Sequence, residues 1–382
     1  MSTDSWAPEG LPIDGALRAT AEGWSFPARS PSTGELLWDV PDAGLVDVRA
    51  AAEAAWTAHR ATTWSTDTGL RIDTLGRFKD ALLAAADDLA ELVATETGVP
   101  VSLRAAHVDA PIAELPTRPT RRKEGVTVVV TPATSPLAVA LEEVARVLVA
   151  GGTIVLKPAP EAAGAALELG RIASQHLPRG VFNVVSTRDV DVAIALTRDR
   201  RVDQVSFTGS AHAGERVKVA ASQAGKHVRL DVGGPLTIRA ADDADLTAVV
   251  SAAAVTVAAN AGQACRLPAS VLVPQHRYME ALAAAIDAME EVAVGDPTDP
   301  ATLCGPLRSG VARDRVRRYV ELARSEGGDI ALGGTTLDRN GWWFAPTVVG
   351  GLDRQSRLVR EEVLGPLLMV VPDARRGSSA RA

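Results

Sequence analysis

The segment from residue 125 to residue 232 constrains the fold most, because short apolar runs alternate there with helix-like stretches. Strands are expected at 126–130, 153–156, 181–185, 202–207 and 228–232, and helices at 137–150, 162–175, 190–197 and 211–224. Apolar strands that alternate with helices are typical of a parallel sheet covered on both faces. This part of the chain is therefore predicted to form an α/β domain.

The regions on either side predict a less regular start and a second α/β region. Before the sheet, residues 1–45 are expected to be loop with one or two strands, followed by helices at 46–60 and 70–97 and a connector at 100–124. After Gly233, helices are expected at 244–259, 278–290 and 311–325, and strands at 270–273, 329–332 and 364–371. We predict a first domain over 1–232, a second over 233–371, and a disordered tail at 372–382.

The composition excludes several functional classes. Of the 382 residues, 46% are hydrophobic and 23% charged, which is ordinary for a globular protein and unlike a disordered chain. A net charge of −7, with one short basic cluster at Arg118–Lys123, argues against a nucleic-acid partner. No apolar run reaches the ~18 residues of a membrane helix. Without a secretory signal or a disulfide framework, the chain is predicted to be cytoplasmic.

Cys265 is the first candidate for chemistry. It follows Gly262-Gln263 at the end of a predicted helix, where an exposed thiolate could attack an electrophilic carbon. The alternative is a small, buried and inert side chain. We interpret Cys304 as structural.

Two further candidates lie at predicted strand ends. Gly209, Ser210 and Gly214 follow a strand and open a helix, an arrangement that favours a phosphate, although the glycine spacing is not G-x-G-x-x-G. Gly209 could alternatively serve the turn alone. Lys157 ends another strand, where open α/β sheets bind ligands; otherwise it is a solvated charge.

The carboxylates offer less specific signals. Asp231 could act as a general base or accept hydrogen bonds from the glycine turn that follows it. Glu361 and Glu362 are adjacent acids, a pattern that more often marks a solvated face. The chain has no H-x-x-H or C-x-x-C spacing, so no metal is predicted.

Taken together and in order, these segments resemble the aldehyde dehydrogenase superfamily. The resemblance covers about residues 10–371 and is carried by Thr131-Pro132, Leu156-Lys157-Pro158, Gly180–Val185, Phe207–Ser210, Leu230–Gly234, Gly262–Cys265, Gly305–Leu307, Ala345–Thr347 and Glu361–Pro366.

The resemblance implies a Rossmann-like cofactor domain over 1–232, a catalytic α/β domain over 233–371, and oxidation of a small-molecule aldehyde with NAD or NADP. Cys265 takes the position of the nucleophile, which forms a thiohemiacetal and then a thioester. Lys157 falls at the adenosine ribose, and Glu362 at the nicotinamide ribose. Gly209, Ser210 and Gly214 fall at the pyrophosphate.

Several departures from the family pattern predict weak or absent activity. Thr134 replaces the asparagine that donates to the oxyanion, and loss of such a donor costs about 2.7–4 kcal/mol. Asp231 replaces a glutamate base and is one methylene shorter, and Pro235 replaces a lysine. The connector at 100–124 is short for the family. The chain also stops soon after Pro366, so the catalytic domain is expected to be C-terminally incomplete, with an uncovered sheet edge.

Two alternative functions stay open at this point. One is a non-catalytic relic that binds a cofactor or a partner, and the other is a CoA-acylating aldehyde dehydrogenase, in which a thiol resolves the thioester. The choice between NAD and NADP is also open, because Pro160 stands where NAD-preferring relatives often carry glutamate. A homo-oligomer is possible, but both assembly elements are reduced.

Overall fold

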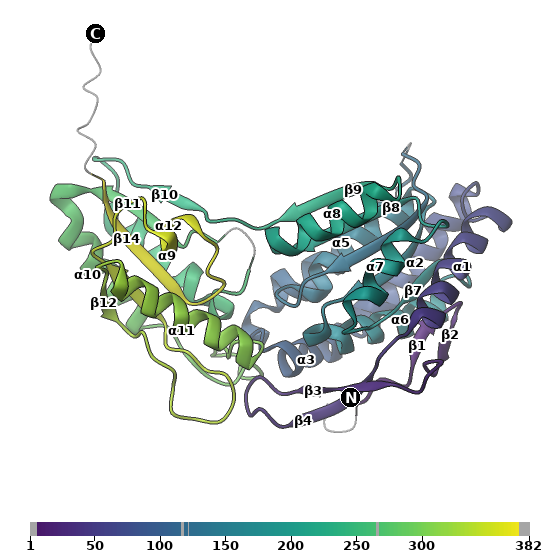
Figure 1. Cartoon of the computed structure of the whole chain (residues 1–382), viewed down its shortest axis with the longest axis horizontal. Coiled ribbons are helices and arrows are strands. Elements are labelled where there is room, and N and C mark those ends of the chain that lie inside the picture. The colour runs from purple at the N-terminus through teal and green to yellow at the C-terminus, as the bar shows by residue number, and fades with distance from the viewer. Residues whose placement is uncertain (1–5, 116–117, 121, 265–266, 374–382) are drawn as a thin grey trace, which may run out of the picture. The chain divides into compact units, whose positions relative to one another are not determined.

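The apolar runs between residues 125 and 232 form one parallel sheet with strand order β7-β6-β5-β8-β9 (Figure 1). The computed structural model describes residues 6–115, 118–120, 122–264 and 267–373. The strands are β5 (Val126–Thr131), β6 (Thr153–Pro158), β7 (Phe182–Val184), β8 (Gln204–Gly209) and β9 (His227–Val232). The order reverses between β5 and β8, and α/β sheets bind ligands beyond the carboxyl ends of strands at such a point.

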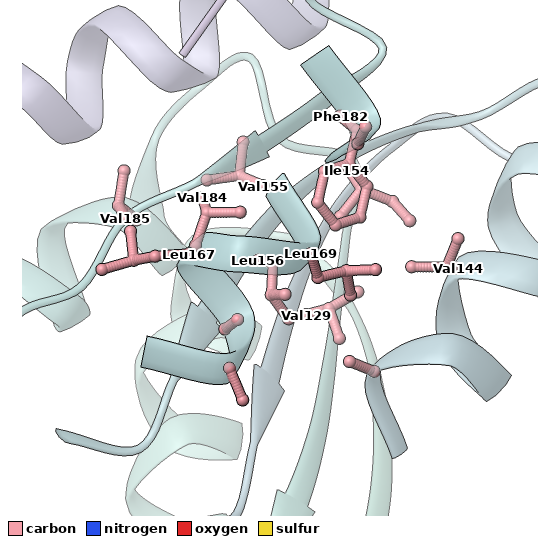
Figure 2. Close-up of a cluster of buried hydrophobic side chains, with 14 of the residues drawn as sticks. Val129, Val144, Ile154, Val155, Leu156, Leu167, Leu169, Phe182, Val184 and Val185 are labelled. Carbon is pink, nitrogen blue, oxygen red and sulfur yellow. The ribbon is translucent and has the colours of Figure 1, made fainter. Parts of the chain in front are cut away.

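Helices cover both faces of this sheet. One face is covered by α5 (Pro136–Val149) and α6 (Ala163–His176), and the other by α1 (Leu45–Ala61), α7 (Val190–Arg198) and α8 (Ala211–Gln223). In Figure 2, Val129 and Leu156 of the sheet lie among Val144 of α5 and Leu167 and Leu169 of α6, all nearly inaccessible to solvent. Burying one such side chain stabilises the fold by about 1.5–3 kcal/mol.

The predicted helix at 70–97 is two helices, so that expectation was wrong. The first, α2 (Thr68–Ala84), ends at Ala85, and the second, α3 (Ala86–Thr97), begins directly after it. Asp87 and Asp88 lie in the first turn of α3, where negative charge stabilises a helix N-terminus. Gly98 ends α3 in a left-handed conformation (φ 80°), as its residue type predicts.

The start of the chain has more structure than predicted. Two antiparallel ribbons pair β1 (Leu11–Ile13) with β2 (Ala16–Arg18), and β3 (Ser25–Arg29) with β4 (Leu36–Pro41). The missed signal was Asp14-Gly15, because both residues adopt the positive φ of a tight hairpin turn. The predicted connector also contains helical turns at Val101–Leu103, Ala105–Asp109 and α4 (Ala110–Ala113).

The chain divides into two compact units, Met1–Val232 and Gly233–Ala382. The second has its own sheet with order β10-β11-β14-β13-β12, in which only the β12–β13 pair is antiparallel. Its strands are β10 (Thr237–Arg239), β11 (Ser270–Pro274), β12 (Asp329–Leu332), β13 (Thr347–Gly350) and β14 (Leu367–Asp373). Its helices are α9 (Leu246–Ala258), α10 (Tyr278–Glu290), α11 (Gly310–Ser325) and α12 (Arg357–Arg360).

The strand predicted at 364–371 is displaced by a few residues. Leu364 has a positive φ of 55°, and β14 begins only at Leu367. The strand continues to Asp373, whose carboxylate pairs with Arg239 at 2.6 Å, so it extends into the predicted tail. Residues 374–382 of that tail lie outside the described part. Within the described residues, no helix is both long and apolar enough to span a bilayer.

Candidate active site

Lys157 lies near the carboxyl end of β6, with its backbone opposite Val130 of β5. Its side chain lines a cavity of about 270 Å³ between the sheet and helices α7 and α8. Burial lowers the pKa of Lys157 to about 8, although the carboxylates of Glu161 and Asp42 act in the opposite direction. Other residues that line the cavity include Val128, Val190, Ile194, Val217, Arg188 and Arg216. The cavity therefore combines apolar walls with amine and guanidinium groups.

The predicted phosphate loop lies between β8 and α8. Gly209 is the last residue of β8, and the Ser210 hydroxyl accepts the N–H of Ala213 at 3.4 Å as the N-cap of α8. Gly214 is buried where α8 approaches β9, and a Cβ there would lie 2.7 Å from Cγ1 of Val232. Ser210 and Gly214 thus start the helix and seat it on the strand. The first N–H groups of a helix have no partner within it, and they favour an anion.

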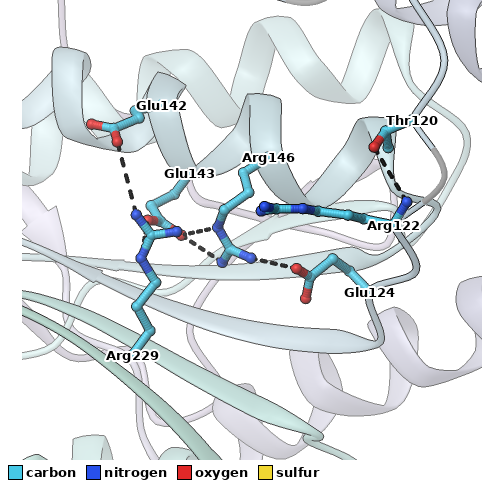
Figure 3. Close-up of polar contacts among 7 residues, drawn as sticks. All are labelled: Thr120, Arg122, Glu124, Glu142, Glu143, Arg146 and Arg229. Atoms are coloured by element: carbon cyan, nitrogen blue, oxygen red, sulfur yellow. Dashed lines mark hydrogen bonds and ion pairs between the residues drawn. The ribbon is translucent and has the colours of Figure 1, made fainter.

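Thr134 and Asp231 both lie at the carboxyl ends of strands of this sheet. Thr134 is buried in the loop between β5 and α5, and Asp231 is half-buried near the end of β9, opposite Thr208. Side chains alternate along a strand. Val232 of β9 faces α8, whereas Arg229 faces Glu143 of α5 (Figure 3).

Alternation therefore gives Asp231 the α5 face of the sheet. The cavity at Lys157 lies on the other face, under α7 and α8. Lys157, the predicted cofactor residue, and Asp231, the predicted base, thus lie near the carboxyl ends of their strands but on opposite faces of the sheet.

In the second unit, a strained turn precedes Cys265. Asn260, Ala261 and Gly262 are left-handed, with φ of 50°, 50° and 68°. Left-handed backbone costs about 1–2 kcal/mol for a residue with a Cβ, so the turn must be held from outside. Cys265 itself lies outside the described residues.

Buried amides hold this turn. The side-chain amide of Gln263 donates to the carbonyl oxygens of Asn260 (3.3 Å) and Pro306 (3.2 Å), and its oxygen accepts the N–H of Arg308 (2.9 Å). Asn260 Nδ2 donates to the carbonyl oxygen of Gln263 at 2.9 Å. Asn260 was missed from the sequence, although asparagine is a residue type that tolerates left-handed backbone.

The Gly262 turn and the Glu361–Pro366 segment are in direct contact. A Cβ on Gly262 would collide with the carbonyl oxygen of Gly365, so this approach requires glycine. A cavity of about 20 Å³ lies beside the contact and is lined by Gly234, Ala264, Leu267 and Glu362 among others. The structure therefore brings Glu362 together with residues on either side of Cys265.

Glu362 differs from its neighbour Glu361. Its Oε1 is buried without a hydrogen-bond partner, and desolvation raises the pKa of Glu362, with Arg315 acting in the opposite direction. A Cβ on Gly233 would collide with this carboxylate, so the glycine after β9 leaves room for it. The two adjacent carboxylates therefore have distinct environments, which their sequence pattern does not reveal.

Cys304 is buried in the core of the second unit. Burial raises the pKa of its thiol to about 12, so the neutral thiol dominates near pH 7. Its environment is that of a structural cysteine. Among the described residues, no three histidine, cysteine or acidic side chains are grouped so as to hold a metal ion.

A parallel sheet whose strand order reverses, with a lysine-lined cavity toward the carboxyl ends of its strands, is typical of the dinucleotide-binding class of α/β enzymes. The sequence matches the aldehyde dehydrogenase family over residues 19–116 and 116–375, and the chain belongs to that family.

The relatives found by comparison agree with this assignment. The chain is 32% identical to geranial dehydrogenase of Castellaniella defragrans over 365 residues, which are 89% of this chain and 76% of that protein. It superposes on the NAD-dependent aldehyde dehydrogenase of Sinorhizobium meliloti with a TM-score of 0.91 and 28% identity, covering 97% of this chain and 79% of the other. For an NAD+ complex of the Bacillus cereus enzyme the TM-score is 0.90, with 26% identity and coverage of 96% and 80%. Complexes with NAD and with NADP are both found among such structures.

Proposed function

We propose that this chain oxidises an aldehyde to a carboxylic acid with NAD+ or NADP+. The observation that carries the proposal is the family match, which includes every candidate residue from Thr134 to Glu362. Relatives with NAD-linked or aldehyde dehydrogenase names support the same chemistry.

The residues present fit a dinucleotide. The cavity at Lys157 has apolar walls suited to a purine, and its amine suits ribose hydroxyls. The unpartnered Oε1 of Glu362 is an acceptor suited to a second ribose hydroxyl. Gly209, Ser210 and Gly214 are assigned to the pyrophosphate, because the amide groups at the start of α8 favour anions. When bound, the nicotinamide would accept the hydride that leaves the substrate carbon.

The remaining candidates are assigned to the chemistry on the substrate. The Cys265 thiolate adds to the aldehyde carbon, and the Thr134 hydroxyl donates to the carbonyl oxygen as negative charge develops there. Once the hydride has left, the carbon stays attached to sulfur as a thioester. Asp231 takes a proton from the water that attacks this thioester, the carbon–sulfur bond breaks, and the acid is released.

We expect hydrolysis of the thioester to be the slow step. A general base must lie within about 2.6–3.2 Å of the water it deprotonates, and aspartate reaches one methylene less than the family's glutamate. Thr134 in place of asparagine is expected to slow both half-reactions, because loss of one oxyanion donor typically costs about 10²–10³ in rate.

The test is formation of reduced cofactor by the purified chain from a panel of aldehydes, with NAD+ and NADP+ assayed separately. Slow turnover that is lost in Cys265→Ser and retained in Cys304→Ser is the expected result. Cys304→Ser is the matched control, because Cys304 is buried and its thiol pKa is raised.

Each other outcome refutes a defined part of the proposal. Turnover at a full dehydrogenase rate contradicts the impairment, and turnover that survives Cys265→Ser contradicts the nucleophile. If acyl-CoA forms when CoA is added, a thiol and not water resolves the thioester. No cofactor binding and no turnover together refute the function.

A further inference from the structure

The two adjacent carboxylates of the Glu361–Pro366 segment are held differently. The Glu361 carboxylate accepts the hydroxyl of Tyr319 at 2.9 Å, Nε of Arg357 at 2.7 Å and Nη2 of Arg357 at 3.3 Å. The bond from Arg357 is the larger cause that lowers the pKa of Glu361, and the bond from Tyr319 acts in the same direction. Glu362, by contrast, has an oxygen with no partner. One carboxylate is engaged in internal contacts, and its neighbour has a buried oxygen without a hydrogen-bond partner.

One face of α11 makes several contacts with this segment. Arg315 donates from Nη2 to the carbonyl oxygen of Glu362 at 2.5 Å, and Tyr319 lies one helical turn further along. The Arg315 guanidinium lies over the Tyr319 ring, 5.7 Å from its centroid. Val316 packs where a Cβ on Gly365 would lie, so the same helix fixes the loop at a third point.

These contacts orient the loop more than they stabilise the fold. The side chains of Arg357 and Glu361 are 62% and 37% exposed, and exposed ion pairs contribute little to unfolding free energy. The same contacts fix the orientation of the Glu361 carboxylate, because two donors from different helices converge on it. The backbone carbonyl of the next residue is fixed at the same time.

We propose that Arg315, Tyr319, Arg357 and Glu361 form a positioning clamp that holds the Glu362 carboxylate toward the ribose of the bound dinucleotide. The inference rests on the proposed cofactor function of Glu362. The four residues act through the conformation of residue 362 and not by contact with substrate or cofactor.

The first measurement is calorimetric binding of NAD+ and of NADP+ to the full chain. Glu361→Gln keeps the size of the side chain and loses its charge, and it is expected to weaken binding about three- to tenfold, the range that one net hydrogen bond provides. The matched control is Glu321→Gln. Glu321 pairs with Arg317 on α11 at 3.9 Å, is more exposed than Glu361 (62% against 37%), and is not part of the clamp. The control is expected to leave binding unchanged.

The second measurement separates positioning from a general structural effect. Since Glu361 acts through Glu362, the loss caused by Glu361→Gln is expected to disappear in a Glu362→Gln background. Arg357→Lys retains the positive charge and is expected to recover part of the affinity lost in Arg357→Gln.

The outcomes distinguish this inference from the function on which it rests. If Glu362→Gln weakens cofactor binding but Glu361→Gln does not, or if the two losses are additive, the clamp is refuted and the function stands. If Glu362→Gln has no effect, or the wild type binds neither cofactor, both the clamp and the cofactor role of Glu362 are refuted.

Discussion

Replacing Gly262 with alanine tests the contact between the turn before Cys265 and the Glu361–Pro366 segment. The residue has a φ of 68°, which costs an alanine about 1–2 kcal/mol. The added Cβ would also collide with the carbonyl oxygen of Gly365. A backbone shift forced by overpacking costs about another 1–3 kcal/mol. The free energy of unfolding should therefore fall by about 2–5 kcal/mol.

Gly327→Ala is the matched control for this substitution. Gly327 has a φ of 84°, but a Cβ there would meet nothing within 4 Å. The free energy of unfolding of Gly327→Ala should fall only by the cost of the left-handed backbone, about 1–2 kcal/mol. Urea unfolding of both variants, compared at an unchanged m-value, measures the difference. Equal destabilisation of the two variants would refute the collision. Cofactor binding should also weaken in Gly262→Ala alone, because the loop that carries Glu362 must shift.

Three further predictions follow from particular side chains. Lys157→Met should weaken binding of NAD+ or NADP+ at least tenfold by calorimetry, since it removes the amine but keeps the apolar stem. Unchanged affinity would show that the cavity at Lys157 does not bind the cofactor. Asp231→Glu should raise the steady-state rate of aldehyde oxidation, because it restores the missing methylene, and a lower rate would contradict the assignment of the base. Glu96 accepts the N–H groups of Gly164 (2.5 Å) and Ala165 (2.9 Å), yet burial raises its pKa from 4.5 to about 7. The folded state therefore binds the Glu96 proton more tightly than the unfolded state. The resulting contribution to the free energy of unfolding is present at low pH and is lost as the pH rises. Relative to Glu96→Gln, the wild type should lose about 3 kcal/mol of unfolding free energy as the pH rises from 4.5 to 7, and a difference that is flat with pH would contradict this.

The sheet of the first unit was predictable because its strands are buried on both faces. A strand such as β5 is a continuous apolar run, so the sequence pattern and the burial coincide. The short strand β10 was missed, because its three residues alternate between exposed and half-buried positions. A short strand that forms mainly by pairing with one neighbour has no clear hydrophobic pattern by which it could be recognised in the sequence.

Candidate residues for the site could be named from the sequence, but the contacts among them could not be predicted. The sequence placed Gly262 and Glu362 in separate segments, and the contact between Gly262 and Gly365 arises only when β11 and β14 pair. The different roles of Glu361 and Glu362 depend on α11, whose Tyr319 lies more than forty residues earlier in the chain. The long predicted helix at 70–97 failed for a related reason, since its apolar spacing continues across the break at Ala85.

We propose that Cys265 carries the acyl group and that release of this group limits turnover. Rapid-mixing measurement of reduced cofactor, with enzyme and a saturating aldehyde, tests this most directly. We expect an initial burst of up to one equivalent of reduced cofactor per chain, followed by a much slower steady rate, with no burst in Cys265→Ser. Linear product formation without a burst, or a burst that persists in Cys265→Ser, would contradict it.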